Sequence, residues 1–262
     1  MEQDLKKLVR TQFGKTASAY VHSTDFSGGE DLEAARELLQ PVPEDLMLDV
    51  ATGGGHTALF FAPLVKTVVA SDLTIQMLKK AQEVIAEEKG VDNISFREAD
   101  AEDLPFPAGS FTLLTCRIAP HHFYDLSRAI QEFFRVLRRG GRMVIIDTLR
   151  PDNEELAEFQ ARMEKLRDPS HNRTYGKKHW LEELESAGFR ELRSFVFRKS
   201  RDFENWVKRA GMAPAAHQEL IRMFLEAPPS VRDYFHMDII DGEIRRFSDE
   251  KILLYAQKPS KK

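Results

Sequence analysis

Short apolar runs alternate with longer stretches of helical periodicity between residues 46 and 148, and no other feature constrains the fold as strongly. The runs are rich in Val, Ile, Leu and Phe, which is typical of buried strands. Strands that alternate with helices are joined by right-handed crossovers, so the pattern predicts an α/β fold with a doubly wound, mostly parallel sheet. The expected strands are Leu46–Val50, Thr67–Ala70, Ile94–Arg97, Phe111–Cys116 and Met143–Asp147.

The segments between these strands carry the ends that helices need. Thr74 can cap a helix that Gly90 ends, and Asp125 can cap a second helix that is followed by Gly140. An N-cap side chain, an apolar face and a terminal glycine follow one another in the order expected of a helix.

The flanking regions are more helical. Residues 1–45 form an N-terminal helical region with a break at 27–29, and residues 201–237 are a helical insertion before the last strand. Asp241-Gly242 suits the tight turn of a hairpin. The remaining expected elements are a helix at 177–187 ended by Gly188, a strand at 192–198, hairpin strands at 237–240 and 243–247, and a last strand at 252–256.

The composition fits a folded enzyme-sized chain and excludes several classes of protein. A length of 262 residues, with 42% apolar and 31% charged residues, suits one globular domain. A net charge of −4 argues against a nucleic-acid partner bound on a broad basic face. The single cysteine, Cys116, excludes an internal disulfide and a cysteine-based zinc site, and it favours a cytoplasmic location. The charged N-terminus predicts no signal peptide, and no apolar run is long enough for a membrane span.

A glycine-rich turn follows the first expected strand in the stretch Asp49–His56. Glycines let the backbone approach a ligand closely, and the helix that starts near Thr57 offers its N-terminus to oxygen or carboxylate groups. A glycine loop alone is a weak signal, because a tight strand-to-helix turn needs the same residues.

Two acids at the ends of the next strands strengthen the signal. Asp72 follows the second strand and Asp100 follows the third. The carboxyl ends of parallel strands are where open α/β sheets bind ligands, and an acid after the second strand can accept hydrogen bonds from ribose hydroxyls.

Two nucleoside cofactors could bind to a glycine loop that is followed by acids in this way. A nicotinamide dehydrogenase needs its first glycine directly after the strand, and that position is Ala51 here. The order Asp49, Ala51, Gly53, Gly55 fits better the loop that holds S-adenosylmethionine. An NAD(P)-dependent oxidoreductase and a non-catalytic S-adenosylmethionine-binding protein remain the alternatives.

These motifs together resemble those of the class I S-adenosylmethionine-dependent methyltransferases, in the ubiquinone/menaquinone C-methyltransferase-like (UbiE-like) group. The stretches that carry the resemblance are Asp49–His56, Asp72, Glu98–Phe106 and Gly109–Phe111. His121-His122-Phe123, Arg135–Gly141 and Arg167–His171 resemble the bacterial YcgJ-like branch. The resemblance covers nearly the whole chain and implies a Rossmann-like, seven-stranded sheet in one domain. It makes residues 1–45 a lid, 46–150 the cofactor-binding core and 151–262 the substrate side.

The resemblance also implies the cofactor contacts. Asp49, Ala51, Gly53 and Gly55 would surround the methionine end. Asp72 would bind the ribose, with Leu73 against the adenine. Asp100 and the Ala101 N–H would hold the adenine ring. Arg117 would lie under the cofactor, and Tyr20 matches a lid motif that closes over the methionine end.

Methyl transfer needs a base only where the acceptor group that attacks the methyl carbon still carries a proton that must be removed. His121 and His122 follow the fourth strand and are the candidates for that base, because imidazole titrates near neutral pH. A turn in which these histidines only pack is the alternative. His171 and Arg173 follow the fifth strand and are the candidate acceptor-binding residues. The histidines lack the spacing of a metal site, so no metal is expected.

The absence of two motifs narrows the range of possible methyl acceptors. After the fourth strand the chain reads Arg117–His122 and lacks the Asn/Asp-Pro-Pro-aromatic motif of amino-methylating nucleic-acid enzymes. One cysteine is too few for an arsenic-binding site. The sequence therefore predicts transfer of a methyl group to a carbon or oxygen of a small, partly apolar molecule, and it leaves the acceptor and the oligomeric state open.

Overall fold

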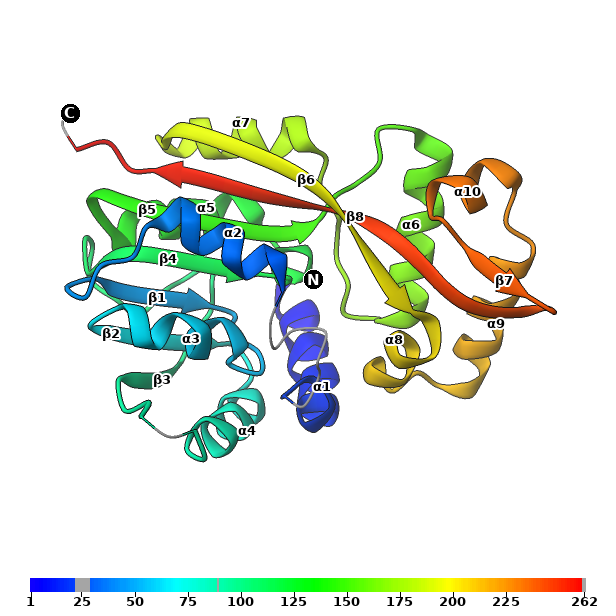
Figure 1. Cartoon of the computed structure of the whole chain (residues 1–262), viewed down its shortest axis with the longest axis horizontal. Coiled ribbons are helices and arrows are strands. Elements are labelled where there is room, and N and C mark those ends of the chain that lie inside the picture. The colour runs from blue at the N-terminus through cyan, green and yellow to red at the C-terminus, as the bar shows by residue number, and fades with distance from the viewer. Residues whose placement is uncertain (22–28, 89, 261–262) are drawn as a thin grey trace.

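The computed structural model describes residues 1–21, 29–88 and 90–260, and one twisted sheet runs through this part of the chain (Figure 1). Its strands lie in the order β3-β2-β1-β4-β5-β8-β6, with a short β7 beside β8. The first five pair in parallel, whereas β8 is antiparallel to both of its main neighbours, β5 and β6. The expected doubly wound, mostly parallel sheet of seven strands is confirmed, and β7 adds an eighth. The strands are β1 (Leu46–Val50), β2 (Thr67–Asp72), β3 (Ile94–Glu98), β4 (Phe111–Arg117), β5 (Leu137–Thr148), β6 (Arg190–Asp202), β7 (Asp238–Ile240) and β8 (Glu243–Gln257).

Helices cover both faces of the sheet. The α-helices are α1 (Glu2–Val21), α2 (Glu30–Leu39), α3 (His56–Phe61), α4 (Ile75–Ile85), α5 (Leu126–Val136), α6 (Glu154–Arg167), α7 (Lys177–Ala187), α8 (Phe203–Ala210), α9 (Pro214–Leu225) and α10 (Pro229–Tyr234), and two short 3₁₀ turns are η1 (Ala62–Leu64) and η2 (Pro120–His122). In Figure 1, α2 and α3 lie in front of the sheet and α5 lies behind it. Two separate apolar clusters result, one on each face.

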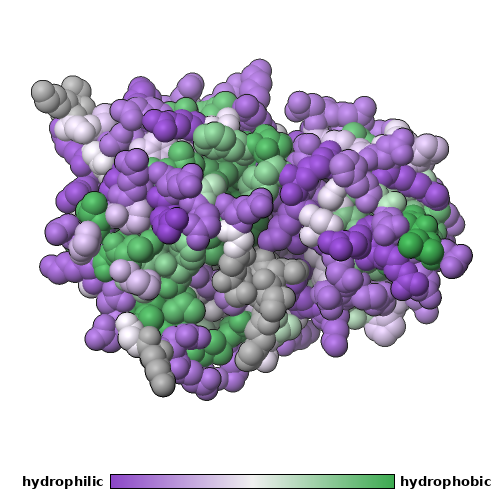
Figure 2. All heavy atoms as spheres, viewed as in Figure 1, coloured by the Kyte–Doolittle hydropathy of each residue, from purple (hydrophilic) through white to green (hydrophobic). Residues whose placement is uncertain are grey.

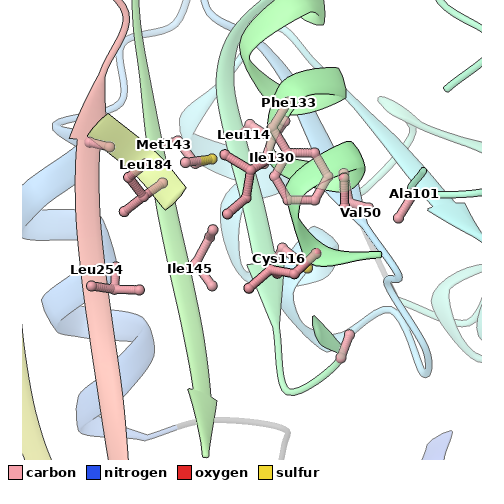
Figure 3. Packing of buried hydrophobic residues seen from close by; sticks show 14 of the residues in the cluster. Val50, Ala101, Leu114, Cys116, Ile130, Phe133, Met143, Ile145, Leu184 and Leu254 are labelled. Atoms are coloured by element: carbon pink, nitrogen blue, oxygen red, sulfur yellow. The ribbon is translucent and has the colours of Figure 1, made fainter. Parts of the chain in front are cut away.

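The cluster behind the sheet joins α5 and α7 to the strands. Figure 3 shows Ile130 and Phe133 of α5 beside Leu114 of β4, with Met143 of β5 and Leu254 of β8 in the same cluster. All five side chains are at most 1% exposed. Apolar area removed from water stabilises the fold by about 25 cal/mol per Å², so this packing holds the strands whose ends form the site.

Shortening one side chain in this cluster should lower stability measurably. We expect Ile130→Val to reduce the free energy of unfolding by about 0.5–1.5 kcal/mol, because a buried methyl group is lost and a small cavity remains. Urea denaturation measures the change, and Ile75→Val, at a position that is 39% exposed, is the matched control. Equal stability losses in the two variants would contradict this packing.

The second half of the chain extends the sheet beyond its core. Both β6 and β8 are long, and the outer end of β8 packs with α6, α8 and α9 in an apolar cluster that contains Trp206 and Phe247. The expected helical insertion is confirmed as α8–α10. The expected hairpin is also confirmed, and its second strand continues without a break into the expected last strand as β8.

Two helices end earlier than predicted. The first, α4, ends at Ile85, and Gly90 lies beyond it with a φ of 82°. The second, α5, ends at Val136 because the chain turns directly into β5, where Leu137 already pairs with Phe111. Gly140, with a φ of 74°, lies inside a bulge of β5 and not at a helix end. The predicted N-cap positions are correct, although only Asp125 accepts a hydrogen bond there, from the Arg128 N–H at 3.1 Å.

The break expected at 27–29 falls mostly outside the described residues; α2 begins directly after Gly29.

On the face shown in Figure 2, apolar residues gather over the half that holds the core sheet, and the other half is mostly hydrophilic. Among the described residues, no helix is both long and apolar enough to cross a membrane.

Candidate functional site

One cavity lies where β1, β2 and β4 end, and the empty space in it, counted together with its open mouth, is about 980 Å³. In Figure 1 these strand ends point towards α1 and the helices of the insertion. The cavity brings together most of the residues that the sequence singled out. Those in its wall are Tyr20, Ala51, Gly53, Asp72, Leu73, Asp100, Ala101, Arg117 and His122.

The glycine loop between β1 and α3 forms the floor of the cavity. Gly53 has a φ of 55°, and a side chain added there would touch only the Met77 Cε, at 3.7 Å. Ala51 replaces the usual family glycine, and its φ of 52° is also left-handed. A left-handed alanine costs about 1–2 kcal/mol, so the loop keeps this shape because its neighbours fix it.

Asp72 ties this loop to the end of β2. Its two carboxylate oxygens accept hydrogen bonds from the Gly53 N–H at 2.9 Å and the Thr74 N–H at 2.8 Å. Burial raises the pKa of this carboxyl, and the same two hydrogen bonds oppose the rise. The oxygens keep further lone pairs for a ligand.

Asp49 and Gly55 lie next to the cavity but not in its wall. The Asp49 carboxylate accepts from the Thr52 hydroxyl at 2.6 Å and the Thr115 hydroxyl at 2.7 Å, and burial raises its pKa to about 6. Asp49 therefore contacts the cavity wall through Thr52, which does line the cavity. Gly55 permits close packing, since a side chain there would meet the Ile85 Cδ1 at 2.7 Å.

The loop after β3 forms the opposite wall with Asp100 and Ala101. The Asp100 Oδ1 accepts from the Glu102 N–H at 3.0 Å, and its Oδ2 lies 2.7 Å from the Nζ of Lys6 in α1. The sequence-based prediction missed Lys6. A weak signal exists: Lys6, Phe13 and Tyr20 recur every seven residues, so they share one face of α1, and all three line the cavity.

Two residues close the cavity near the glycine loop. Arg117, at the end of β4, donates from its Nε to Asp31 of α2 at 2.7 Å. The Tyr20 hydroxyl accepts a hydrogen bond from Arg167 of α6 at 3.3 Å, and the backbone carbonyl oxygen of Tyr20 lies 3.1 Å from the His56 Nε2. The N-terminal helices and α6 are thus joined at this end.

The adjacent histidines of η2 have different surroundings. His121 does not line the cavity; its Nδ1 lies 2.6 Å from Asp147, and its backbone N–H donates to the other oxygen of the same carboxylate at 2.9 Å. Burial, together with the charge of Lys251 and the charge that His122 carries when protonated, lowers the pKa of His121 well below its usual value. His121 is therefore neutral near pH 7.

His122 faces the cavity, and its hydrogen bond fixes its tautomer. Its Nδ1 lies 3.0 Å from the Ser170 carbonyl, which can only accept, so Nδ1 carries the proton and the neutral ring has its lone pair on Nε2. That Nε2 lies 3.8 Å from an Asp168 carboxylate oxygen, and the Phe13 ring meets the imidazole at a centroid distance of 5.0 Å.

Asp168 shapes the loop that holds His122. Its Oδ1 accepts from the Ser170 N–H at 2.8 Å and the Ser170 hydroxyl at 2.6 Å, which turns the Ser170 carbonyl towards His122. Burial favours a raised pKa for Asp168, but the positive charge that His122 carries when protonated and the Ser170 hydrogen bonds hold it below the usual value. The sequence offered Arg167–His171 as a motif, but it did not single out Asp168 or Ser170.

His171 and Arg173 do not line the cavity. His171 is 4% exposed, stacks on His121 at 5.0 Å, and has a pKa lowered to about 2 by burial and by the two other histidines. Arg173 is exposed, and its guanidinium lies 5.6 Å from the centre of the Tyr175 ring. The His171 ring packs on His121, and the Arg173 backbone N–H donates to the His121 carbonyl at 3.0 Å.

Known proteins are similar to this chain in sequence and in architecture. YcgJ of Bacillus subtilis, named as an uncharacterized methyltransferase, is 34% identical over 227 residues, which cover 86% of this chain and 88% of that protein. The chain is a class I S-adenosylmethionine-dependent methyltransferase. The profile of a family described as a methyltransferase domain matches residues 48–145, from β1 into β5. A UbiE enzyme of ubiquinone/menaquinone biosynthesis from a Marinomonas strain is 33% identical over 115 residues, which cover 43% of this chain and 46% of that enzyme.

Solved methyltransferase structures agree over most of the fold. The crystal structure of the Bacillus subtilis YcgJ protein superposes with a TM-score of 0.83 at 32% identity, and it covers 87% of this chain and 98% of its own. A putative methyltransferase from Bacillus halodurans reaches the same TM-score at 39% identity, with 88% and 100% covered. The expected Rossmann-like methyltransferase fold is confirmed.

Proposed function

We propose that the cavity binds S-adenosylmethionine and that the methyl group passes to a carbon or oxygen of a small, partly apolar acceptor. The acids of the cavity wall carry this proposal: Asp72 and Asp100 stand on two neighbouring strand ends and face one space. Asp72 would accept from the ribose hydroxyls and Asp100 from the adenine amino group. The bare backbone at Gly53 leaves room for the methionine end.

The residues present fit this cofactor chemically. Hydroxyl and amino donors of a nucleoside need acceptors, and both carboxylates offer them; a flat ring needs apolar walls, and Leu73, Met77 and Ala101 supply these. Arg117 and Tyr20 would lie near the methionine end. When bound, S-adenosylmethionine supplies an electrophilic methyl group on a positively charged sulfur.

The acceptor would lie at the His122 end of the cavity. Phe13, Tyr20 and Phe123 give this end an aromatic wall, which suits a small ring or a short apolar molecule. The partly matching UbiE relatives carry names of C-methyltransferases, which supports carbon as one acceptor atom.

We assign the role of general base to His122. Its Nε2 lone pair would take a proton from an acceptor hydroxyl as the oxygen or its conjugated carbon attacks the methyl carbon and the methyl–sulfur bond breaks, which leaves S-adenosylhomocysteine. Asp168 would stabilise the imidazolium that forms, and the Ser170 carbonyl keeps the ring in place. We do not assign this role to His121, because it does not line the cavity.

Two measurements test this function. Calorimetry should show binding of S-adenosylhomocysteine and no binding of NADH, and the reverse result would favour the dehydrogenase alternative. Incubation with S-adenosylmethionine and a panel of quinols, phenols and small acids should then give one product heavier by a methyl group, detected by mass spectrometry. Tight cofactor binding without transfer to any of them would favour a protein that only binds the cofactor.

A further inference from the structure

Lys6 of α1 is a buried cation at the adenine end of the cavity. Its side chain is 8% exposed, and its Nζ lies 2.7 Å from Glu2, 2.7 Å from Asp100 and 3.2 Å from Glu102. The ammonium group donates hydrogen bonds to Glu2 and Asp100, and the Glu102 Oε2 is an ion-pair partner without a hydrogen bond. Two of these acids, Asp100 and Glu102, belong to the loop after β3, and both line the cavity.

The rest of α1 lies across the mouth of the same cavity. Val9, Phe13 and Tyr20 line it from the helix face that carries Lys6. Arg10 donates to the Leu73 carbonyl at 3.3 Å, and Gln12 donates to the Ala210 carbonyl of α8 at 2.7 Å. The helix therefore spans from the cofactor core to the insertion, and Lys6 attaches its first turns to the core.

The Lys6 contacts differ in kind from a surface ion pair. Exposed pairs contribute little, whereas a buried charge that loses its partner leaves an uncompensated group behind. Burial alone would lower the pKa of Lys6, but the hydrogen bonds to Asp100 and Glu2 raise it. Without Lys6, the three carboxylates would repel one another and push the first turns of α1 away from the loop.

We propose that Lys6 is a positioning residue for the cofactor. Lys6 holds α1 over the adenine end of the cavity, and it fixes the Asp100 carboxylate so that the remaining lone pairs of Asp100 face the adenine amino group. This inference rests on the proposed placement of S-adenosylmethionine. It adds a residue on α1 that controls how long the cofactor stays bound and how well adenine is distinguished from a base without the amino group.

The test compares dissociation of S-adenosylhomocysteine from the wild type, Lys6→Met and Lys7→Met by stopped-flow displacement. Lys7 is the matched control, because it is the next residue but is exposed and outside the cavity wall. We expect dissociation from Lys6→Met to be about tenfold faster, since the loss of one partner of a buried pair acts mainly on the off-rate. Dissociation from Lys7→Met should match the wild type.

A second ligand separates positioning from general destabilisation. The wild type should prefer S-adenosylhomocysteine over S-inosylhomocysteine, which has an oxygen in place of the amino group, and Lys6→Met should lose most of that preference. The double variant Lys6→Met/Glu102→Gln removes the buried carboxylate left without its cation and keeps the Oε1 that accepts from the Tyr124 N–H. It should show the same loss of preference even where the single variant folds poorly.

The outcomes distinguish this inference from the proposed function. If the wild type binds neither nucleoside, the proposed cofactor placement itself fails. If the wild type binds S-adenosylhomocysteine, and both Lys6 variants keep the wild-type off-rate and the wild-type preference for adenine, the positioning role of Lys6 is refuted. Slower dissociation from Lys6→Met would also overturn it, because Lys6 would then compete with adenine for Asp100.

Discussion

Replacing His122 with alanine is expected to slow methyl transfer by about 10²–10⁴-fold and to leave the affinity for S-adenosylmethionine nearly unchanged. His122 is the histidine of η2 that lines the cavity, and its Nε2 carries the lone pair because its Nδ1 donates to Ser170. The acids proposed to hold the nucleoside, Asp72 and Asp100, lie on other strand ends. A base that touches only the acceptor should therefore act on the chemical step alone.

Single-turnover methyl transfer measures this step, with cofactor titration as the parallel readout. His121→Ala is the neighbouring control. That change leaves Asp147 without its ring partner, so it should lower stability while keeping much more of the chemical rate than His122→Ala. Full rates in both variants would rule out a base at this position. Weakened cofactor binding with an unchanged chemical step would assign His122 to the cofactor instead.

Asp168→Asn tests the second part of the same arrangement. The asparagine oxygen can still accept from Ser170 and hold the loop, but the negative charge 3.8 Å from the His122 Nε2 is gone. We expect a smaller loss of rate than in His122→Ala, without a change in cofactor affinity. A rate equal to that of the wild type would show that the Asp168 charge takes no part in the reaction.

The sequence predicted the parts of the site that depend on strand ends. Asp72 and Asp100 could be placed beside the glycine loop because parallel strands bring their carboxyl ends to one edge. The contacts across the cavity could not be predicted, since Lys6 reaches Asp100 from a helix 94 positions earlier in the chain. The orientations of the adjacent residues His121 and His122 could not be predicted either. The η2 turn in the structure shows that His122 faces the cavity and that His121 faces Asp147.

Asp72→Ala should weaken binding of S-adenosylhomocysteine about 10–100-fold, which corresponds to about 1.5–3 kcal/mol for hydrogen bonds to a charged acceptor. Part of that loss has another cause, because the same carboxylate also holds the N–H groups of Gly53 and Thr74. A weaker ligand alone would therefore not identify the ribose as the partner of Asp72.

An analogue of S-adenosylhomocysteine without the 2′ and 3′ hydroxyls separates the two causes. The wild type should bind the analogue more weakly than the complete ligand, whereas Asp72→Ala should bind both equally, because the hydrogen bonds that distinguish them are already absent. Asp103→Ala, an exposed acid after the same β3 strand as Asp100, should keep the full preference of the wild type. If Asp72→Ala still prefers the complete ligand by the wild-type factor, the ribose is held by other groups, and the role of Asp72 is confined to shaping the glycine loop.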